Sequence, residues 1–385
     1  MNFEFDETQQ SVIKVVQDFA KHELAPYIEY IDENDHLPGD KAFFKKAGDA
    51  GLLGLSFSEE YGGSGLSCET QMIAHEELSK VCPGATIAVL TSLAGIEIIL
   101  KHGTQEQKDK YLAACIAGDL VSGMAFTEPG TGSDPKQLTT SARDEGAYFV
   151  LNGVKRFITN AAYPGPCTFY AKDEVDGTCS AYIVDKFCEG YSLSSEWDKI
   201  GFKGSPVYDV FLDEVKVPKE NRIGAKGDGF KILLAESAVG KMGHGAVSLG
   251  IMEACQNLAI KYANEKLHKD KPITKFPAIQ MKIADICMYT ESLRYMTYRC
   301  GKLADVDTTS EQFKSYAAMV KTYAAETAPK VALLAMNIMG SYGPMKEYSV
   351  ERFMRDALVE PHIEVVSDVQ RLITARYFIQ TYIKA

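Results

Sequence analysis

Apolar residues in the first 120 positions recur at the spacing of α-helices. Val12, Val16 and Ala20 lie on one face of such a pattern, and Asp6 with Gln9 forms a capping box in front of it. The same spacing predicts helices at about 40–52, 68–81, 87–102 and 105–117, with a glycine-rich turn at 60–65 between the first two. We therefore expect an N-terminal helical domain over residues 1–120.

The pattern changes to short apolar runs near residue 121. Residues 148–151 and 154–159 flank Asn152-Gly153, a pair that favours the positive φ angles of a two-residue hairpin turn. Further strands are predicted at 168–171, 181–184 and 207–217, with a turn at Asp176-Gly177. These runs predict a middle β-domain, a barrel or sandwich, over residues 121–228.

Helical spacing returns after Gly229 and continues to the end of the chain. Long apolar-periodic segments cover about 230–263, 279–303, 310–339 and 365–383, and Pro329 is expected to kink the third. Helices followed by strands and then helices, without alternation, exclude a βαβ fold. The expected fold is mainly α with a small β-domain and a C-terminal four-helix bundle over 229–385.

Composition places the chain among ordinary folded proteins. Charged residues make up 24% of its 385 positions and hydrophobic residues 46%, which excludes disorder and fibrous repeats. The net charge of -11 disfavours nucleic acid and anionic membranes as partners. The acidic N-terminus, together with the expectation that no apolar run reaches the ~20 residues of a membrane span, predicts a cytoplasmic protein.

The residues that bind metals and activate nucleophiles form no familiar pattern. The nine cysteines are scattered without a C-x-x-C pair and the seven histidines form no ligand set, so we predict buried thiols and no metal site. Gly63-Ser64-Gly65 is not a nucleophile elbow, and Gly130-Thr131-Gly132 lacks the setting of a dinucleotide loop. The residues alone therefore do not define a reaction.

Two segments of the predicted β-domain could contact a cofactor. The loop 126–134 exposes hydroxyls and backbone N–H donors suited to an anionic group, although a plain surface loop has the same composition. Phe157 and Thr159 lie two residues apart on a strand and could flank a flat ring system. A half-buried strand without a ligand explains the second pattern equally well.

Glu364 is the third candidate. Ile363 and Val365 flank it, and apolar neighbours that shield a carboxylate raise its pKa and make it a general base. Most glutamates in such a setting face water instead.

Taken together and in order, six short motifs resemble the acyl-CoA dehydrogenase family. They are Ser58 to Gly65, Phe126 to Asp134, Phe157 to Asn160, Asp213 to Pro218, Arg355 to Ala357 and Gln370 to Leu372. The family uses FAD to remove hydrogen across Cα and Cβ of an acyl thioester. The resemblance covers nearly the whole chain and agrees with the predicted order of domains.

The resemblance implies positions for the cofactor and the base. FAD would lie between the β-domain and the bundle, with Met124, Phe126 and Thr127 near the isoalloxazine and Phe157 and Thr159 on its far side. Ser133 would lie beside the pantetheine or nucleotide part of the thioester. Glu364 occupies the position of the catalytic glutamate, which takes the α-proton while the β-hydrogen passes to flavin N5. Some relatives carry the base where this chain has Gly240, which cannot serve.

Several positions depart from the family pattern. Val365-Val366 replaces a Gly-Thr pair, and Lys266 to Asp270 replaces an Arg-x-x-Phe-Gly motif that reaches the FAD of a neighbouring subunit. Lys241 stands where arginine is usual on the substrate side, Ala238 where an acid is common, and Pro277 and Asn337 where glutamine is common. The implied cofactor-binding set is completed by Lys266, His268, Asn337, Gly340, Val366 and Asp368, and the implied substrate-binding set is Ser133 and Lys241.

The favoured hypothesis is a FAD-dependent acyl-CoA dehydrogenase acting on a short, branched or cyclic acyl group. Electron-transferring flavoprotein would be the electron acceptor, and the assembly a homotetramer. Three alternative hypotheses keep the same fold but assign a different function. They are a dehydrogenase or oxidase for a carrier-protein thioester in secondary metabolism, a flavin monooxygenase, and a flavin-free binding or assembly protein.

Overall fold

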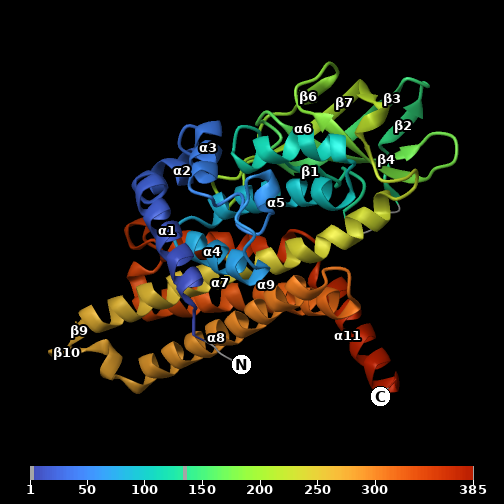
Figure 1. Cartoon of the computed structure of the whole chain (residues 1–385). Helices are drawn as coiled ribbons and strands as arrows, with labels where there is room; N and C mark the ends of the chain where they lie inside the picture. Colours follow the sequence, from blue (N-terminus) through green and yellow to red (C-terminus); the bar gives the residue numbers. More distant parts are fainter. Residues whose placement is uncertain (1–3, 133–136, 385) are drawn as a thin grey trace.

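The structure, a computed structural model, describes residues 4–132 and 137–384. A β-sheet domain and a layer of long C-terminal helices are joined through the N-terminal helices, which lie against both (Figure 1). The predicted fold class is confirmed: a helical N-terminal part, a middle sheet and a helical C-terminal part. The proposed domain limits themselves stay a prediction.

The N-terminal part begins with the predicted capping box. The Asp6 carboxylate accepts a hydrogen bond from the Gln9 amide at 2.8 Å, and the Gln9 side chain accepts one from the Asp6 amide. The helices are α1 Glu7–Glu23, α2 Ile28–Asn34, α3 Lys41–Asp49, α4 Cys68–Ser79, α5 Pro83–His102 and α6 Gln105–Ile116. α5 starts earlier than predicted because proline is well tolerated in the first helical turn.

The expectation that no segment is long and apolar enough to cross a membrane is wrong for α5. By length and composition this helix passes such a test, with a mean hydropathy of 1.7. Within the fold, 78% of that window is buried, since α5 packs against α4, α6 and α7. Core packing therefore accounts for its apolar composition.

The middle part is one sheet in the order β6-β7-β3-β2-β4-β5-β8, with the short β1 paired in parallel to β4. Its strands are β1 Met124–Ala125, β2 Ser141–Asp144, β3 Tyr148–Thr159, β4 Pro166–Asp173, β5 Cys179–Asp185, β6 Tyr191–Leu193, β7 Val207–Pro218 and β8 Arg222–Ile223. The β4–β5 connection contains the predicted Asp176-Gly177 turn, and β7 ends at Pro218 as expected.

The hairpin predicted at Asn152-Gly153 is wrong. β3 runs through both residues, and its ladder with β7 shifts register between Leu151 and Gly153, which marks a β-bulge. The Asn152 side chain accepts from the Glu214 amide at 2.8 Å and donates to the Glu214 carboxylate at 2.6 Å. Asn152 therefore forms hydrogen bonds with a residue of β7, far along the chain, and does not form a turn. The chain reverses direction at 145–147 instead, between β2 and β3.

The C-terminal part consists of long helices around α7. They are α7 Gly229–Glu265, α8 Pro277–Val306, α9 Glu311–Met339, α10 Val350–Val359 and α11 Ser367–Lys384. α10 was not predicted, and α9 continues through Pro329. A hairpin of β9 Leu267–His268 and β10 Lys271–Pro272 lies at one end of this layer, and α11 extends away at the other (Figure 1).

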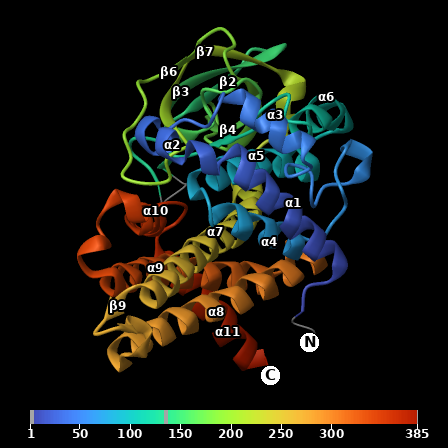
Figure 2. The same ribbon diagram turned by 90° about the vertical axis from the view of Figure 1, so that its left-hand side faces the viewer.

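α7 is the helix that the layers share. α4 and α5 pack on it from the N-terminal part, and α8 and α9 from the C-terminal part (Figure 2). Glycine at position 245 makes the α9 contact possible, since a Cβ there would lie 2.1 Å from a Val320 methyl carbon. Side chains along α7 can therefore meet residues from both ends of the sequence.

Candidate functional site

Glu364 lies in the short connection between α10 and α11. Its φ angle is +62°, in the left-handed region that residues other than glycine rarely adopt. The residue is exposed, but its carboxylate reaches α7: a Cβ built on Gly240 would lie 2.7 Å from Glu364 Oε1. The strained backbone therefore aims the predicted base at the N-terminal third of α7.

Gly240 makes room for that carboxylate. Glycine inside a helix costs roughly 1 kcal/mol relative to alanine, because it loses more backbone freedom on folding. Alanine would place a methyl group against the Glu364 oxygen. The glycine therefore keeps the surface of α7 open at the point where the carboxylate lies.

Lys241, predicted to bind substrate, follows Gly240 on α7 and is 7% exposed. Burial lowers the pKa of its ammonium group, and the negative charge of Glu364 acts in the opposite direction. The structure therefore brings two of the predicted site residues, Glu364 and Lys241, into electrostatic contact. Their catalytic and binding roles stay predictions.

Phe157 is the most exposed aromatic group of the sheet. It has a φ angle of +59° and 53% of its surface is exposed, and its ring meets the edge of Trp197 at a centroid distance of 5.3 Å. The register of β3 shifts between Lys155 and Ile158. The simple alternation that would place Phe157 and Thr159 on one strand face therefore does not hold through this bulge.

The surroundings of Phe157 include residues that the sequence analysis missed. Arg156 donates to both oxygens of Asp209, the shorter pair being Nη2 to Oδ2 at 2.8 Å, and Trp197 Nε1 donates to Asp209 Oδ1 at 2.9 Å. One carboxylate thus fixes a guanidinium and an indole beside the exposed ring. Trp197 is the sole tryptophan of the chain, which is the one signal that could have drawn attention to it.

The short strand β1, which holds Met124, and the loop after it, which holds Phe126 and Thr127, lie next to this segment. The Arg156 amide donates to the Thr127 carbonyl at 2.7 Å, and the Phe126 ring packs edge-on against Tyr170 at 5.9 Å. Met124 pairs with Thr168 in the sheet. Two of the segments proposed to contact a cofactor are therefore adjacent, whereas Ser133 falls outside the described residues.

A buried ion pair supports the same loop. Lys155 Nζ donates to Glu128 Oε1 at 2.8 Å and to the carbonyls of Phe126 and Tyr170. Glu128 also accepts from the backbone and hydroxyl of Thr139. Burial alone would raise the Glu128 pKa, but Lys155 and the hydroxyl donors outweigh it and lower the pKa to about 2.

Glu128→Gln is expected to remove an acid-dependent part of the stability. A carboxylate whose pKa falls from 4.5 to about 2 on folding stabilises the protein above pH 4.5 and loses that effect as the pH falls through 2. The contribution is at most about 3 kcal/mol. Chemical denaturation between pH 5 and 2 should show a flatter pH dependence for Glu128→Gln than for the exposed control Glu189→Gln. Equal slopes for the two variants would contradict this assignment.

Four predicted cofactor residues lie at the far end of the C-terminal layer. Lys266 and His268 are exposed at the β9–β10 hairpin, and Asn337 and Gly340 are exposed at the end of α9. Lys266 Nζ lies 5.2 Å from the centre of the Tyr342 ring. Tyr342 follows Gly340 by two residues. Figure 1 shows this end well separated from β3, so these residues do not join Phe157 within one chain.

Val366 and Asp368 flank the start of α11, close in sequence to Glu364. Val366 is 43% exposed, and Asp368 accepts from Arg371 at 3.3 Å on the exposed surface. Both residues therefore lie close to the predicted base. No contact among the described residues joins either of them to residues 124–127.

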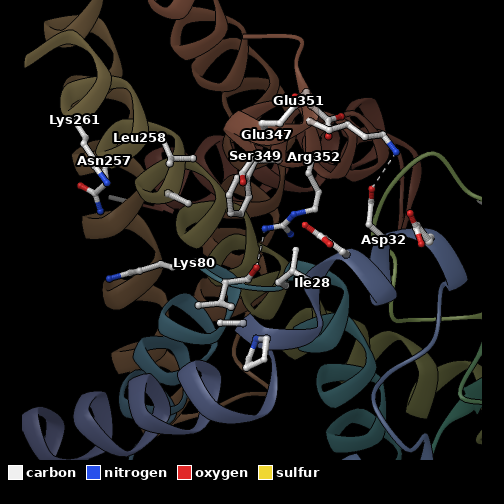
Figure 3. Close-up of a pocket in the computed structure, with 18 residues that line it drawn as sticks. Ile28, Asp32, Lys80, Asn257, Leu258, Lys261, Glu347, Ser349, Glu351 and Arg352 are labelled. Atoms are coloured by element: carbon white, nitrogen blue, oxygen red, sulfur yellow. Dashed lines mark hydrogen bonds and ion pairs between the residues drawn. The ribbon is translucent and has the colours of Figure 1, made fainter. Parts of the chain in front are cut away.

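A separate cavity of about 900 Å³ lies between the N-terminal helices, α7 and α10 (Figure 3). Acidic and basic side chains line it together, among them Asp32, Lys80, Lys261 and Arg352. Arg352 donates to the Val81 carbonyl at 3.0 Å and thereby ties α10 to the α4–α5 connection. Of the predicted site residues that the structure describes, none lines this cavity.

Three family models match the chain along its length. Residues 6–119 match the acyl-CoA dehydrogenase N-terminal domain, residues 123–215 the middle domain, and residues 227–379 the C-terminal domain. A short-chain specific acyl-CoA dehydrogenase of Clostridium acetobutylicum is 36% identical over 378 residues, covering 97% of this chain and 98% of the relative.

Solved structures agree over nearly the whole fold. Butyryl-CoA dehydrogenase from Megasphaera elsdenii has a TM-score of 0.94 at 31% identity, covering 98% of this chain and 100% of that one. A chain from work on the electron transferring flavoprotein of Acidaminococcus fermentans gives 0.93 at 34%, covering 98% and 99%. An acyl-CoA dehydrogenase from Bacillus anthracis, complexed with FAD, gives 0.91 at 31%, covering 99% and 68%.

Proposed function

Because this chain belongs to the acyl-CoA dehydrogenase family, whose enzymes are oxidoreductases acting on a CH–CH bond, we propose that it dehydrogenates a short acyl-CoA thioester with FAD as its cofactor. The observation that carries the proposal is the Glu364 carboxylate held against Gly240. A positioned carboxylate is the group that α-proton removal requires. Membership of the family supports the reaction, and the position of the carboxylate supports Glu364 as the base.

In this mechanism Glu364 accepts the proton from Cα of the bound thioester. FAD supplies the acceptor for the hydrogen that leaves Cβ with its electron pair. Substrate binding would cover the exposed Glu364 side chain and remove water from it, which makes a carboxylate more basic. Lys241, buried beside the base, would hold negative charge nearby in the bound state.

The residues present fit a flat cofactor. Phe157 exposes 53% of its surface on a sheet whose other large aromatic rings are mostly packed, and Asp209 fixes Arg156 and Trp197 beside it. A planar ring stacked here would cover that apolar surface. Met124, Phe126, Thr127, Phe157 and Thr159 are the side chains that would hold the flavin.

A charged cluster supports a short acyl group. Glu236 lies one turn before Gly240 on α7, and its carboxylate accepts from Lys101 at 3.1 Å and contacts His102 at 2.9 Å. α5 runs beside this part of α7, since Leu90 fills the space next to Gly243. An acyl chain between α5 and α7 would therefore meet paired charges about 5 Å beyond the base, one helical turn away.

We further propose electron-transferring flavoprotein as the acceptor and a homotetramer as the assembly. Exposed apolar side chains follow one side of α8 and the end of α11, including Met281, Met288, Phe378 and Ile379. Such surfaces mark contacts between subunits more often than free surface. A neighbouring subunit would also bring Lys266 and Asn337 to a cofactor that they do not reach within their own chain.

Purified protein loaded with FAD should test the reaction and the chain length together. We expect butyryl-CoA to bleach the flavin absorbance, and octanoyl-CoA to do so at least about tenfold more slowly, because the charged cluster blocks added methylenes. The double variant Glu236→Ala/Lys101→Ala should bring the rate of bleaching by octanoyl-CoA closer to the rate with butyryl-CoA. A protein that stays colourless with FAD, or no bleaching by any thioester in a panel, would refute the proposal.

A further inference from the structure

A buried charged cluster lies directly before the predicted base. Glu360 is fully buried and Lys321 is 2% exposed. Lys321 Nζ donates to the Glu360 carboxylate at 2.7 Å and to the main-chain carbonyl of the same residue at 2.6 Å. His244 Nδ1 lies 3.3 Å from both oxygens of the same carboxylate. Side chains of α7 and α9 thus hold both the backbone and the side chain of Glu360.

The spacing of these contacts matches the spacing of the Glu364 contact. Glu360 and Glu364 are four residues apart, as are His244 and Gly240, which share one face of α7. Glu360 meets His244, and Glu364 meets Gly240. The connection from α10 to α11 is therefore docked along α7 at two points by two carboxylates.

The backbone between Glu360 and Glu364 has little regular structure of its own to hold it in place. A single 3₁₀ turn, Glu360–His362, is followed by extended backbone at Ile363 and by the left-handed conformation at Glu364. Regular helical hydrogen bonds do not fix this stretch. Strained residues persist where the surroundings determine them.

The charged groups of this cluster are better explained by a role in holding the segment in place than by a contribution to the stability of the fold. Burial would raise the pKa of Glu360, but Lys321 and His244 outweigh it and hold the pKa below its usual value. His75, packed behind in α4, stays neutral because burial and His244 lower its pKa to about 4. Buried ion pairs often contribute little net stability compared with apolar groups of similar size, so stability alone does not account for this one.

We propose that Lys321, Glu360 and His244 are positioning residues that fix the Glu364 carboxylate against α7. The inference deepens the proposed function and rests on it for the role of Glu364. It assigns a task to three buried side chains that are not among the predicted catalytic and binding residues. Loss of the anchor would let the base move while the helices around it keep their packing.

The test compares Lys321→Met/Glu360→Gln with the parent and with Asp35→Asn/Lys199→Met. Asp35 is a matched control because it is a buried carboxylate paired with Lys199 in another part of the fold. Lys321→Met/Glu360→Gln removes both charges of its pair, so no unpaired ion destabilises the core. We expect its thermal midpoint to stay close to that of the parent. Flavin reduction at saturating thioester should slow by about a hundredfold, the cost of a small displacement of a catalytic group, and the thioester dissociation constant should change little.

Hydrogen exchange gives a readout that needs no catalysis. In the FAD-loaded double variant, backbone amides of 362–366 should exchange faster, whereas those of α7 and α9 should not. The inference would be overturned if the double variant reduced its flavin at the parent rate, or if exchange rose throughout the helices. An equal loss of flavin reduction in Asp35→Asn/Lys199→Met would overturn it too. If no thioester reduces the flavin of the parent, the proposed function fails, and the exchange pattern alone decides whether the cluster anchors the segment.

Discussion

Glu364→Gln is expected to reduce the rate of flavin bleaching by a thioester by about a thousandfold, the middle of the range for loss of a general base. The amide has nearly the same shape but cannot accept the α-proton. FAD content and thermal stability should stay at the parent values, because Glu364 is exposed and its side chain is not part of the core. Stopped-flow absorbance under single-turnover conditions measures the effect directly.

Glu311→Gln is a suitable control for this experiment. Glu311 is also exposed, with 80% of its side chain accessible at the start of α9, away from Gly240. It should leave bleaching unchanged. If Glu364→Gln bleached the flavin as fast as the parent, another group would have to be the base, and the mechanism proposed for this chain would be wrong.

Gly240→Ala is expected to separate activity from stability. Alanine within α7 should stabilise the helix by up to about 1 kcal/mol. The new methyl group would lie 2.7 Å from Glu364 Oε1, and the flexible end of that side chain can move aside without disturbing the core. Thermal stability should therefore hold or rise, while the rate of flavin reduction falls by about a hundredfold because the base is displaced.

A double-mutant cycle distinguishes this explanation from a general effect on the site. If Gly240→Ala acts by displacing the Glu364 carboxylate, it should add little to the loss already caused by Glu364→Gln. Additive losses in the double variant would indicate that Gly240 matters for substrate binding or helix packing instead. A fully active Gly240→Ala protein would show that the carboxylate does not depend on the open surface of α7.

Short-range signals in the sequence determined most of the secondary structure. The capping box at Asp6 and Gln9, the long apolar periods of α7, α8 and α9, and the end of β7 at Pro218 each depend on residues close together in the chain. Asn152-Gly153 shows where this fails, because Glu214 in a distant strand captures the asparagine side chain. α10 was missed although its residues include one of the motifs that carried the family resemblance.

The sequence by itself determined the order of the three parts, the family and, through register with its motifs, Glu364 as the residue in question. Only the tertiary structure decided what surrounds that residue: Gly240 beneath the carboxylate, Lys321 and His244 on the preceding glutamate, and Trp197 and Asp209 beside Phe157. The physical reason is the separation along the chain over which each kind of interaction acts. Helix caps and hydrophobic periods act over a few residues, whereas these contacts join segments tens to more than a hundred positions apart, which only packing brings together.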